Sequence, residues 1–159
     1  MRASLACSDT ARDALTTLPP VLRYSHCVAD ELRKRVVVIG EDDEPIAVLL
    51  RDAVNDEGGY QAVVVPDGAL LIDTVRQVHA DLLILDIMMP GLNGFEIYDK
   101  VRADPDIRDM PVLFVSAAAA QFEAELAKRK ISDVIAKPFD LNDLLERVRA
   151  LCPPDAKGA

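Results

Sequence analysis

Aromatic residues are scarce in this 159-residue sequence, and tryptophan is missing altogether. Only 4% of the residues are aromatic, whereas 50% are hydrophobic and 28% are charged. That balance is ordinary for a globular protein, so the core must be built mainly from Val, Leu, Ile and Ala. A chain of this length fits one domain and needs no disulfide or structural metal to fold.

Cysteine and long apolar runs are also lacking. The three cysteines, Cys7, Cys27 and Cys152, are far apart and form no CxxC pair, which argues against a disulfide framework or a zinc site. Free thiols suit a reducing compartment, so we expect a cytoplasmic protein. The first residues carry no apolar signal segment, and no run approaches the ~18 apolar residues of a membrane span. We therefore expect neither secretion nor membrane insertion.

Positive charge is in deficit. The sequence has 27 acidic residues and 18 Lys and Arg, so its net charge is −9. This charge disfavours a surface that binds nucleic acid. Residues 1–33 hold four acids and four bases, so the whole excess lies from Lys34 onward. Residues 1–33 also lack sustained periodicity and are interrupted by Pro19-Pro20, which predicts an irregular or weakly helical extension.

Residues 34–152 have a regular texture and are predicted to form the domain, with 153–159 as a short tail. The eight residues after Leu151 leave no room for a DNA-binding or enzymatic output domain, so we expect none there. Short apolar runs predict five strands, at residues 36–40, 60–65, 81–86, 110–116 and 133–136. Because these runs are unbroken, both faces of the sheet should be buried, as in a parallel sheet covered by helices.

Helical patterns follow each predicted strand. They cover residues from Pro45 to the Gly58-Gly59 pair, and then 69–79, 94–103, 121–130 and 140–151. In the first of these helices the apolar spacing places one set of residues inward: Ile46, Leu49, Leu50, Ala53 and Val54. Five βα units with right-handed crossovers predict a doubly wound α/β sheet.

Polar residues stand at four of the predicted strand ends. The first strand runs into Glu41-Asp42-Asp43-Glu44, the third into Asp86, the fourth into Ser116 and the fifth into Lys137. In open α/β sheets, functional sites form outside the carboxyl ends of the strands. Neighbouring carboxylates repel each other, and Mg²⁺ would relieve this repulsion while accepting phosphate oxygens as further ligands. A hydroxyl and an ammonium could hold the remaining oxygens while one carboxylate attacks phosphorus.

Four segments carry a resemblance to a known family. They are VIGEDDEP at 38–45, LLILDIMMPGLNGFEI at 82–97, VLFVSA at 112–117 and IAKPFD at 135–140. Over about residues 35–151 the chain resembles the receiver domain of bacterial two-component response regulators. The resemblance implies a flavodoxin-like fold whose five parallel strands have the order 2-1-3-4-5.

The resemblance also implies roles for individual residues. Asp86 is similar to the phosphoacceptor that takes a phosphoryl group from a phosphohistidine. Glu41 and Asp42 resemble the Mg²⁺-binding acidic pair, with Asp42 as the direct ligand and Asp43 one position out of register. Three further positions match the motif: Met88 would offer its backbone carbonyl to the metal, Ser116 resembles the switch hydroxyl, and Lys137 resembles the phosphate-binding lysine, followed by a cis bond to Pro138.

Two positions depart from the family pattern. Gly40 stands where an apolar residue is usual, which would loosen the start of the acidic loop. Val134, three residues before Lys137, replaces a usual Tyr or Phe, so the coupled movement of that ring with the switch hydroxyl is in question. The segment KRKISD at 128–133 replaces the usual small residues before the last strand.

Structural interpretations stand beside these functional ones. Asp86 could be a turn residue, and the acidic run could simply cap a helix, whose N-terminus favours negative charge. The basic residues 128–130 are interpreted as a solvated helix end, and His26 and His79 have no ligand-like neighbours in sequence.

The resulting hypothesis is a single-domain response regulator rather than a conventional enzyme. Its donor would be a histidine kinase or a histidine phosphotransfer protein. Its output would pass to a downstream protein, or to a second copy, through the face made by helix 121–130, strand 133–136 and helix 140–151. The alternative is a degenerate receiver that docks without phosphorylation. A flavodoxin-like cofactor binder is disfavoured by the acidic loop, and a haloacid-dehalogenase-type phosphatase by Met88, because that family has a second Asp there.

Overall fold

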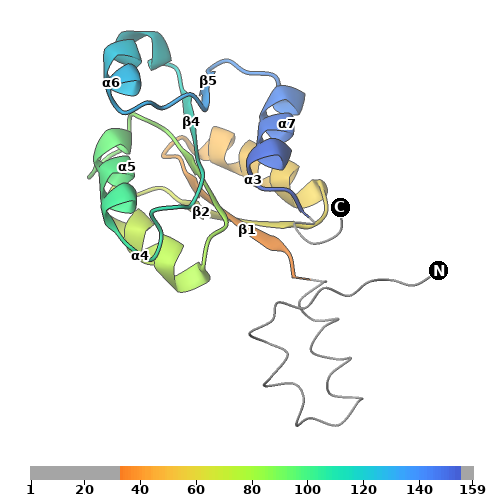
Figure 1. Ribbon diagram of the computed structural model, residues 1–159. Helices are drawn as coiled ribbons and strands as arrows, with labels where there is room; N and C mark the ends of the chain where they lie inside the picture. The colour runs from red at the N-terminus through yellow and green to blue at the C-terminus, as the bar shows by residue number, and fades with distance from the viewer. Residues whose placement is uncertain (1–32, 155–159) are drawn as a thin grey trace, which may run out of the picture. The chain divides into compact units, whose positions relative to one another are not determined.

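Residues 33–154 are described by the structure, a computed structural model in which a five-stranded parallel sheet is covered by helices on both faces (Figure 1). The predictions for residues 1–32 and 155–159, including those on Cys7, Cys27 and His26, lie outside the described residues. None of the helices within residues 33–154 is long and apolar enough to cross a membrane.

The strands follow the predicted order. The sheet runs β2-β1-β3-β4-β5 with every neighbouring pair parallel. This confirms the doubly wound, flavodoxin-like (βα)₅ prediction with strand order 2-1-3-4-5. The strands are β1 (Arg35–Gly40), β2 (Tyr60–Val65), β3 (Leu82–Leu85), β4 (Val112–Ser116) and β5 (Val134–Ala136).

The helices divide between the two faces of the sheet (Figure 1). On one side lie α3 (Glu44–Asp56) and α7 (Leu141–Leu151); on the other lie α4 (Gly68–Val78), α5 (Gly94–Ala103) and α6 (Glu123–Lys128), with the 3₁₀ turn η1 (Ala119–Phe122) before α6. Alternate residues of each strand point to opposite faces. In β1, Val37 and Ile39 pack with α3 and α7, whereas Val38 packs with α4 and α5.

Polar side chains fix the starts of four helices. Asp43, Asp67, Asn93 and Asp140 are N-caps whose side chains accept hydrogen bonds from the first turn of α3, α4, α5 and α7. Such caps satisfy backbone N–H groups that have no partner inside the helix. The start of α3 near Pro45 was predicted from the sequence.

Two local predictions are wrong. The predicted helix 121–130 is instead a 3₁₀ turn followed by the six-residue α6, and neither has a side-chain N-cap. Leu49, predicted to point inward, is 49% exposed. The buried stripe of α3 is Ala47, Leu50 and Val54, and Leu49 lies beside it on the solvent side.

Gly40 has a packing role at the end of β1. A Cβ atom there would lie 2.7 Å from Leu71 Cδ1 and 3.0 Å from Leu85 Cδ1, so its absence lets α4 pack closely on the strand. Gly40 is paired in register with Val65 on one side and Leu85 on the other. We expected Gly40 to loosen the start of the acidic loop. The structure instead shows that the missing Cβ atom lets α4 pack closely on the end of β1.

Candidate functional site

Four adjacent strands deliver the site residues to one edge of the sheet. Glu41 and Asp42 follow β1, Asp86 follows β3, Ser116 ends β4 and Lys137 follows β5. Since β3 lies between β1 and β4, Asp86 stands between the acidic loop and the Ser116 strand end. Parallel strands bring such residues together because all their carboxyl ends meet at the same edge.

Three carboxylates converge at this edge. One oxygen atom from each of Glu41, Asp42 and Asp86 lies within 4.8 Å of the others. Glu41 and Asp86 are buried, at 2% and 7% exposure, whereas Asp42 is exposed. Carboxylate oxygens are the protein ligands that Mg²⁺ prefers, and an exposed third ligand leaves room for the waters that the ion retains. The donor set therefore fits a magnesium ion.

Lys137 joins the two buried carboxylates. Its Nζ lies 2.6 Å from Glu41 Oε2 and 3.0 Å from Asp86 Oδ2. Burial lowers the pKa of Lys137, but the hydrogen bonds to Glu41 and Asp86 outweigh this and raise the pKa above its ordinary value. Burial raises the pKa of Glu41, and the Lys137 hydrogen bond opposes that shift. The lysine is thus held as an ammonium facing Asp86.

The backbone around Asp86 is fixed on both sides. Asp86 Oδ1 accepts a hydrogen bond of 3.1 Å from the Met88 backbone N–H, and the Asp86 N–H donates to the Gly40 carbonyl at 3.0 Å. A Cβ at Gly94 would lie 2.7 Å from the Asp86 carbonyl oxygen, so only glycine lets α5 begin this close. Met88 itself is 59% exposed, so its side chain is not part of the buried cluster.

Ser116 and Asp43 occupy different positions around the cluster. Ser116 is 1% exposed, and its Oγ accepts a hydrogen bond of 3.2 Å from the Ala118 N–H in the turn after β4. Asp43 caps α3 by accepting from the Ile46 N–H at 3.2 Å, and its own N–H donates to Glu41 Oε1 at 3.2 Å. The acidic run therefore combines both interpretations: Asp43 caps a helix while Glu41 and Asp42 join the cluster.

Several features of the site were not anticipated from sequence. The Lys137–Glu41 pair is one, because pattern alone does not show which acid the lysine meets. The close approach at Gly94 is another, because the sequence does not show what a Cβ atom there would meet. The bond between Lys137 and Pro138 is cis, as the resemblance implied. An open hollow of about 380 Å³ lies beside the cluster, lined in part by Glu41, Asp42, Val48, Arg51 and Pro66.

Comparison with known proteins now decides the family. The response regulator receiver domain model matches residues 37–149, which include β1 from Val37 onward, the other four strands and the whole cluster. The chain belongs to the response regulator receiver domain family.

Relatives of this receiver include DNA-binding response regulators. The DNA-binding response regulator MtrA of Mycolicibacterium smegmatis is 32% identical over 122 residues, which cover 76% of this chain and 51% of the relative. The chain thus spans about half the length of the curated relatives that it matches first.

Solved structures agree with the fold. The receiver domain of the Francisella response regulator 1452 has a TM-score of 0.65 and 27% identity, covering 74% of this chain and 96% of that one. The receiver domain of sensor histidine kinase PA1611 from Pseudomonas aeruginosa PAO1 has a TM-score of 0.64 at 24% identity, covering 74% and 97%. That second structure was described with a magnesium ion coordinated in its active-site cleft.

Proposed function

We propose that this receiver accepts a phosphoryl group on Asp86 from the phosphohistidine of a histidine kinase or a histidine phosphotransfer protein, in the cytoplasm. The observation that carries the proposal is the convergence of Glu41, Asp42, Asp86 and Lys137 at one sheet edge. An aspartate beside an ammonium and two further carboxylates that can hold Mg²⁺ is suited to attack at phosphorus, because the ammonium and the ion would neutralise the negative charge on the phosphoryl oxygens.

The transfer is a direct exchange at phosphorus. One Asp86 carboxylate oxygen forms a bond to phosphorus as the bond from phosphorus to the histidine nitrogen breaks, and the imidazole leaves with the electron pair. Lys137, which lies 3.0 Å from Asp86 Oδ2, would contact an oxygen of the transferred group. The Ser116 hydroxyl would turn from the Ala118 N–H toward the same group, since it sits at the adjacent strand end.

Mg²⁺ is the cofactor that the donor set favours. Glu41, Asp42, the Asp86 carboxylate and the Met88 backbone carbonyl would hold it, with Asp42 as the direct ligand of the acidic pair. When bound, the ion neutralises charge on the phosphoryl oxygens. The magnesium described for the PA1611 receiver domain supports this assignment.

The protein acts as a phosphoacceptor rather than as a conventional enzyme, as receiver domains generally do. Its signal would leave through a protein contact or by onward phosphotransfer, and the face formed by α6, β5 and α7 would bind the downstream protein or a second copy. Val134 favours a second candidate function, a docking module that works without phosphorylation, because this position lacks the aromatic ring usual in the family.

Phosphorylation of the intact chain tests the first candidate. With Mg²⁺ and acetyl phosphate, a phosphate-affinity gel should show a shifted band for the unaltered protein and none for Asp86→Asn. Asp43→Asn is the matched control: it also removes one negative charge nearby, and Asn retains the helix cap. Asp43→Asn should therefore still shift. An unaltered protein that never shifts, under any donor condition, would rule out the phosphoacceptor function and favour the docking module.

A further inference from the structure

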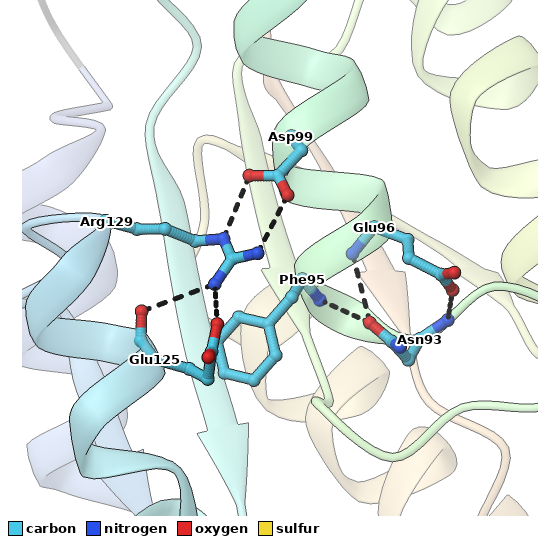
Figure 2. A network of polar contacts seen from close by, with 6 residues as sticks. All are labelled: Asn93, Phe95, Glu96, Asp99, Glu125 and Arg129. Atoms are coloured by element: carbon cyan, nitrogen blue, oxygen red, sulfur yellow. Dashed lines mark hydrogen bonds and ion pairs between the residues drawn. The ribbon is translucent and has the colours of Figure 1, made fainter.

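Arg129 connects two helices on one face of the sheet (Figure 2). Its Nε and Nη2 atoms donate to the two carboxylate oxygens of Asp99 in α5, each at 2.9 Å, and its Nη1 pairs with Glu125 of α6. The side chain is only 21% exposed. The expectation that the basic residues 128–130 form a solvated helix end is therefore wrong for Arg129.

The same guanidinium covers an aromatic ring. The Arg129 Cζ atom lies 4.8 Å from the centre of the Phe95 ring, within cation–π range. Phe122, directly before α6, meets Phe95 edge-on with ring centres 5.5 Å apart. Phe95 also contacts Phe114 of β4 at 5.9 Å. Arg129 and Phe122 thus hold both ends of α6 to one residue of α5.

The two helices differ in their own stability. α5 starts with a capping box (Figure 2). Asn93 Oδ1 accepts hydrogen bonds from the Phe95 and Glu96 N–H groups, and the Glu96 carboxylate accepts one from the Asn93 N–H. α6 has six residues, no side-chain N-cap and a single buried residue, Leu126. A helix this short is unstable by itself, so its position depends on tertiary contacts. α6 therefore depends more than α5 on contacts with the rest of the fold.

A short segment links α6 to the site. β4 ends at Ser116, and residues 117–122 lead directly into α6. The Ser116 hydroxyl accepts a hydrogen bond from Ala118 within this segment. If the hydroxyl turns toward a phosphoryl group on Asp86, that bond is lost and the segment must adjust. Such an adjustment would displace Phe122 and α6. The contacts of Arg129 with Asp99 and Phe95 would oppose that displacement.

We propose that Arg129 is a latch: it holds α6 against α5 and limits how readily this receiver takes the conformation that accepts a phosphoryl group. The inference rests on the proposed function of Asp86 and adds its regulation. The phosphoryl group favours the released conformation, so removing the latch raises phosphorylation. By thermodynamic reciprocity, phosphorylation of Asp86 weakens the Arg129–Asp99 contact.

Two variants of the full chain test the latch. Arg129→Met keeps a long apolar stem against Phe95, and Asp99→Asn removes the charge of the partner. We expect both to raise the initial rate of Asp86 phosphorylation by acetyl phosphate roughly threefold to tenfold, the range set by a partly exposed ion pair and one cation–π contact. The double variant should exceed neither single variant by more than a small factor, since both remove one interaction.

Arg35→Met is the matched control. It removes a partly buried ion pair, from Arg35 at the start of β1 to Asp81 before β3 at 3.3 Å, away from α6 and from the site. Its phosphorylation rate should equal that of the unaltered protein. Backbone hydrogen exchange should become faster in residues 123–130 of unphosphorylated Arg129→Met, and not in Arg35→Met.

The outcomes separate the latch from a purely structural contact. Faster exchange in α6 with an unchanged or lower phosphorylation rate would show that Arg129 only supports the fold, and the latch would be discarded. If Arg129→Met does not fold, Asp99→Asn decides alone, because Asp99 is 54% exposed and tolerates substitution. Absence of phosphorylation in the unaltered protein would instead overturn the function of Asp86, and the latch with it.

Discussion

At the scale of single residues, the main feature is the pairing of Lys137 with Glu41 and Asp86 at the carboxyl edge of the sheet. Glu41 and Asp86 are buried, and each would be costly without a partner. Lys137 contacts both, so one ammonium serves two carboxylates. One positive charge against two buried negative charges leaves an excess that a divalent cation would neutralise. The charge balance of the site therefore suits a divalent cation.

Tyr60 illustrates a buried titratable group outside the site. Its hydroxyl donates to the Cys152 carbonyl at 2.7 Å, joining β2 to the end of α7, and burial raises the pKa of Tyr60 to about 12. The unfolded chain loses this proton near pH 10, before the folded chain does. Folding stability should therefore fall as the pH rises from about 10 to 12.

The Tyr60→Phe variant tests this pH dependence. At pH 7 it should lose about 1 kcal/mol of unfolding free energy, because the Cys152 carbonyl loses its hydrogen-bond donor. Between pH 8 and pH 11 its stability should decline less than that of the unaltered protein, since no phenol remains to ionise. Urea unfolding of both proteins at the two pH values measures the difference. An equal decline in both would contradict the role of Tyr60.

At the scale of elements, two helices end in the same unusual way. α4 and α6 are followed by His79 and Lys130, which have positive φ angles of 51° and 56°. In each case two backbone hydrogen bonds close the helix. At the end of α4, the Ala80 and His79 N–H groups donate to the carbonyls of Val75 and Arg76. At the end of α6, the Ile131 and Lys130 N–H groups donate to the carbonyls of Leu126 and Ala127. This is the Schellman motif, in which glycine is usual because other residues are strained there. His79 is therefore a helix-ending residue, which agrees with its interpretation as unrelated to the site.

Glycine at these two positions should stabilise the protein. We expect His79→Gly and Lys130→Gly each to raise the unfolding free energy by roughly 0.5–1 kcal/mol, because glycine adopts the left-handed conformation without strain. Gln77→Gly is the control, since Gln77 lies inside α4, where glycine should cost about 1 kcal/mol. Denaturant unfolding at constant slope measures all three. Destabilisation by both glycines would show that His79 and Lys130 make contacts worth more than the strain.

At the scale of the whole molecule, the question is how a change at Asp86 reaches the face formed by α6, β5 and α7. Val134 begins β5 and is paired in register with Phe114 of β4. It also lines an open groove of about 500 Å³ with residues of α7, among them Asp143, Glu146 and Arg147. Val134 therefore borders both the sheet and the face formed by α6, β5 and α7.

The Val134→Tyr variant tests whether this position affects the face formed by α6, β5 and α7 rather than the chemistry at Asp86. We expect a tyrosine here to change the phosphorylation-dependent hydrogen exchange of residues 121–151 much more than the rate of Asp86 phosphorylation. The reason is that Val134 begins β5 and borders the face formed by α6, β5 and α7, whereas Asp86 and the acidic pair follow β3 and β1. Val134→Leu, which adds volume without a hydroxyl or ring, is the control. Equal effects of Val134→Tyr on exchange and on rate would contradict this assignment.

Much of the fold and site followed from sequence because both depend on local patterns. Unbroken apolar runs between helical patterns predicted the parallel sheet, and the residue after each strand then had to lie at one edge. Glu41, Asp42, Asp86, Ser116 and Lys137 were predicted in this way, and the structure places all five at that edge. Errors occurred where the pattern was ambiguous, as at Leu49 on the rim of a buried stripe and in the alanine-rich stretch before α6.

The sequence by itself determined which side chains stand at the strand ends, since strand order and direction leave few other places for them. Only the tertiary structure decided their partners: Lys137 with Glu41, Leu71 against Gly40, and Arg129 with Asp99 across two helices. The physical reason is that periodicity describes one element at a time. A contact between distant residues depends on how closely elements pack, and that is set by side-chain volumes and charges summed over the whole core.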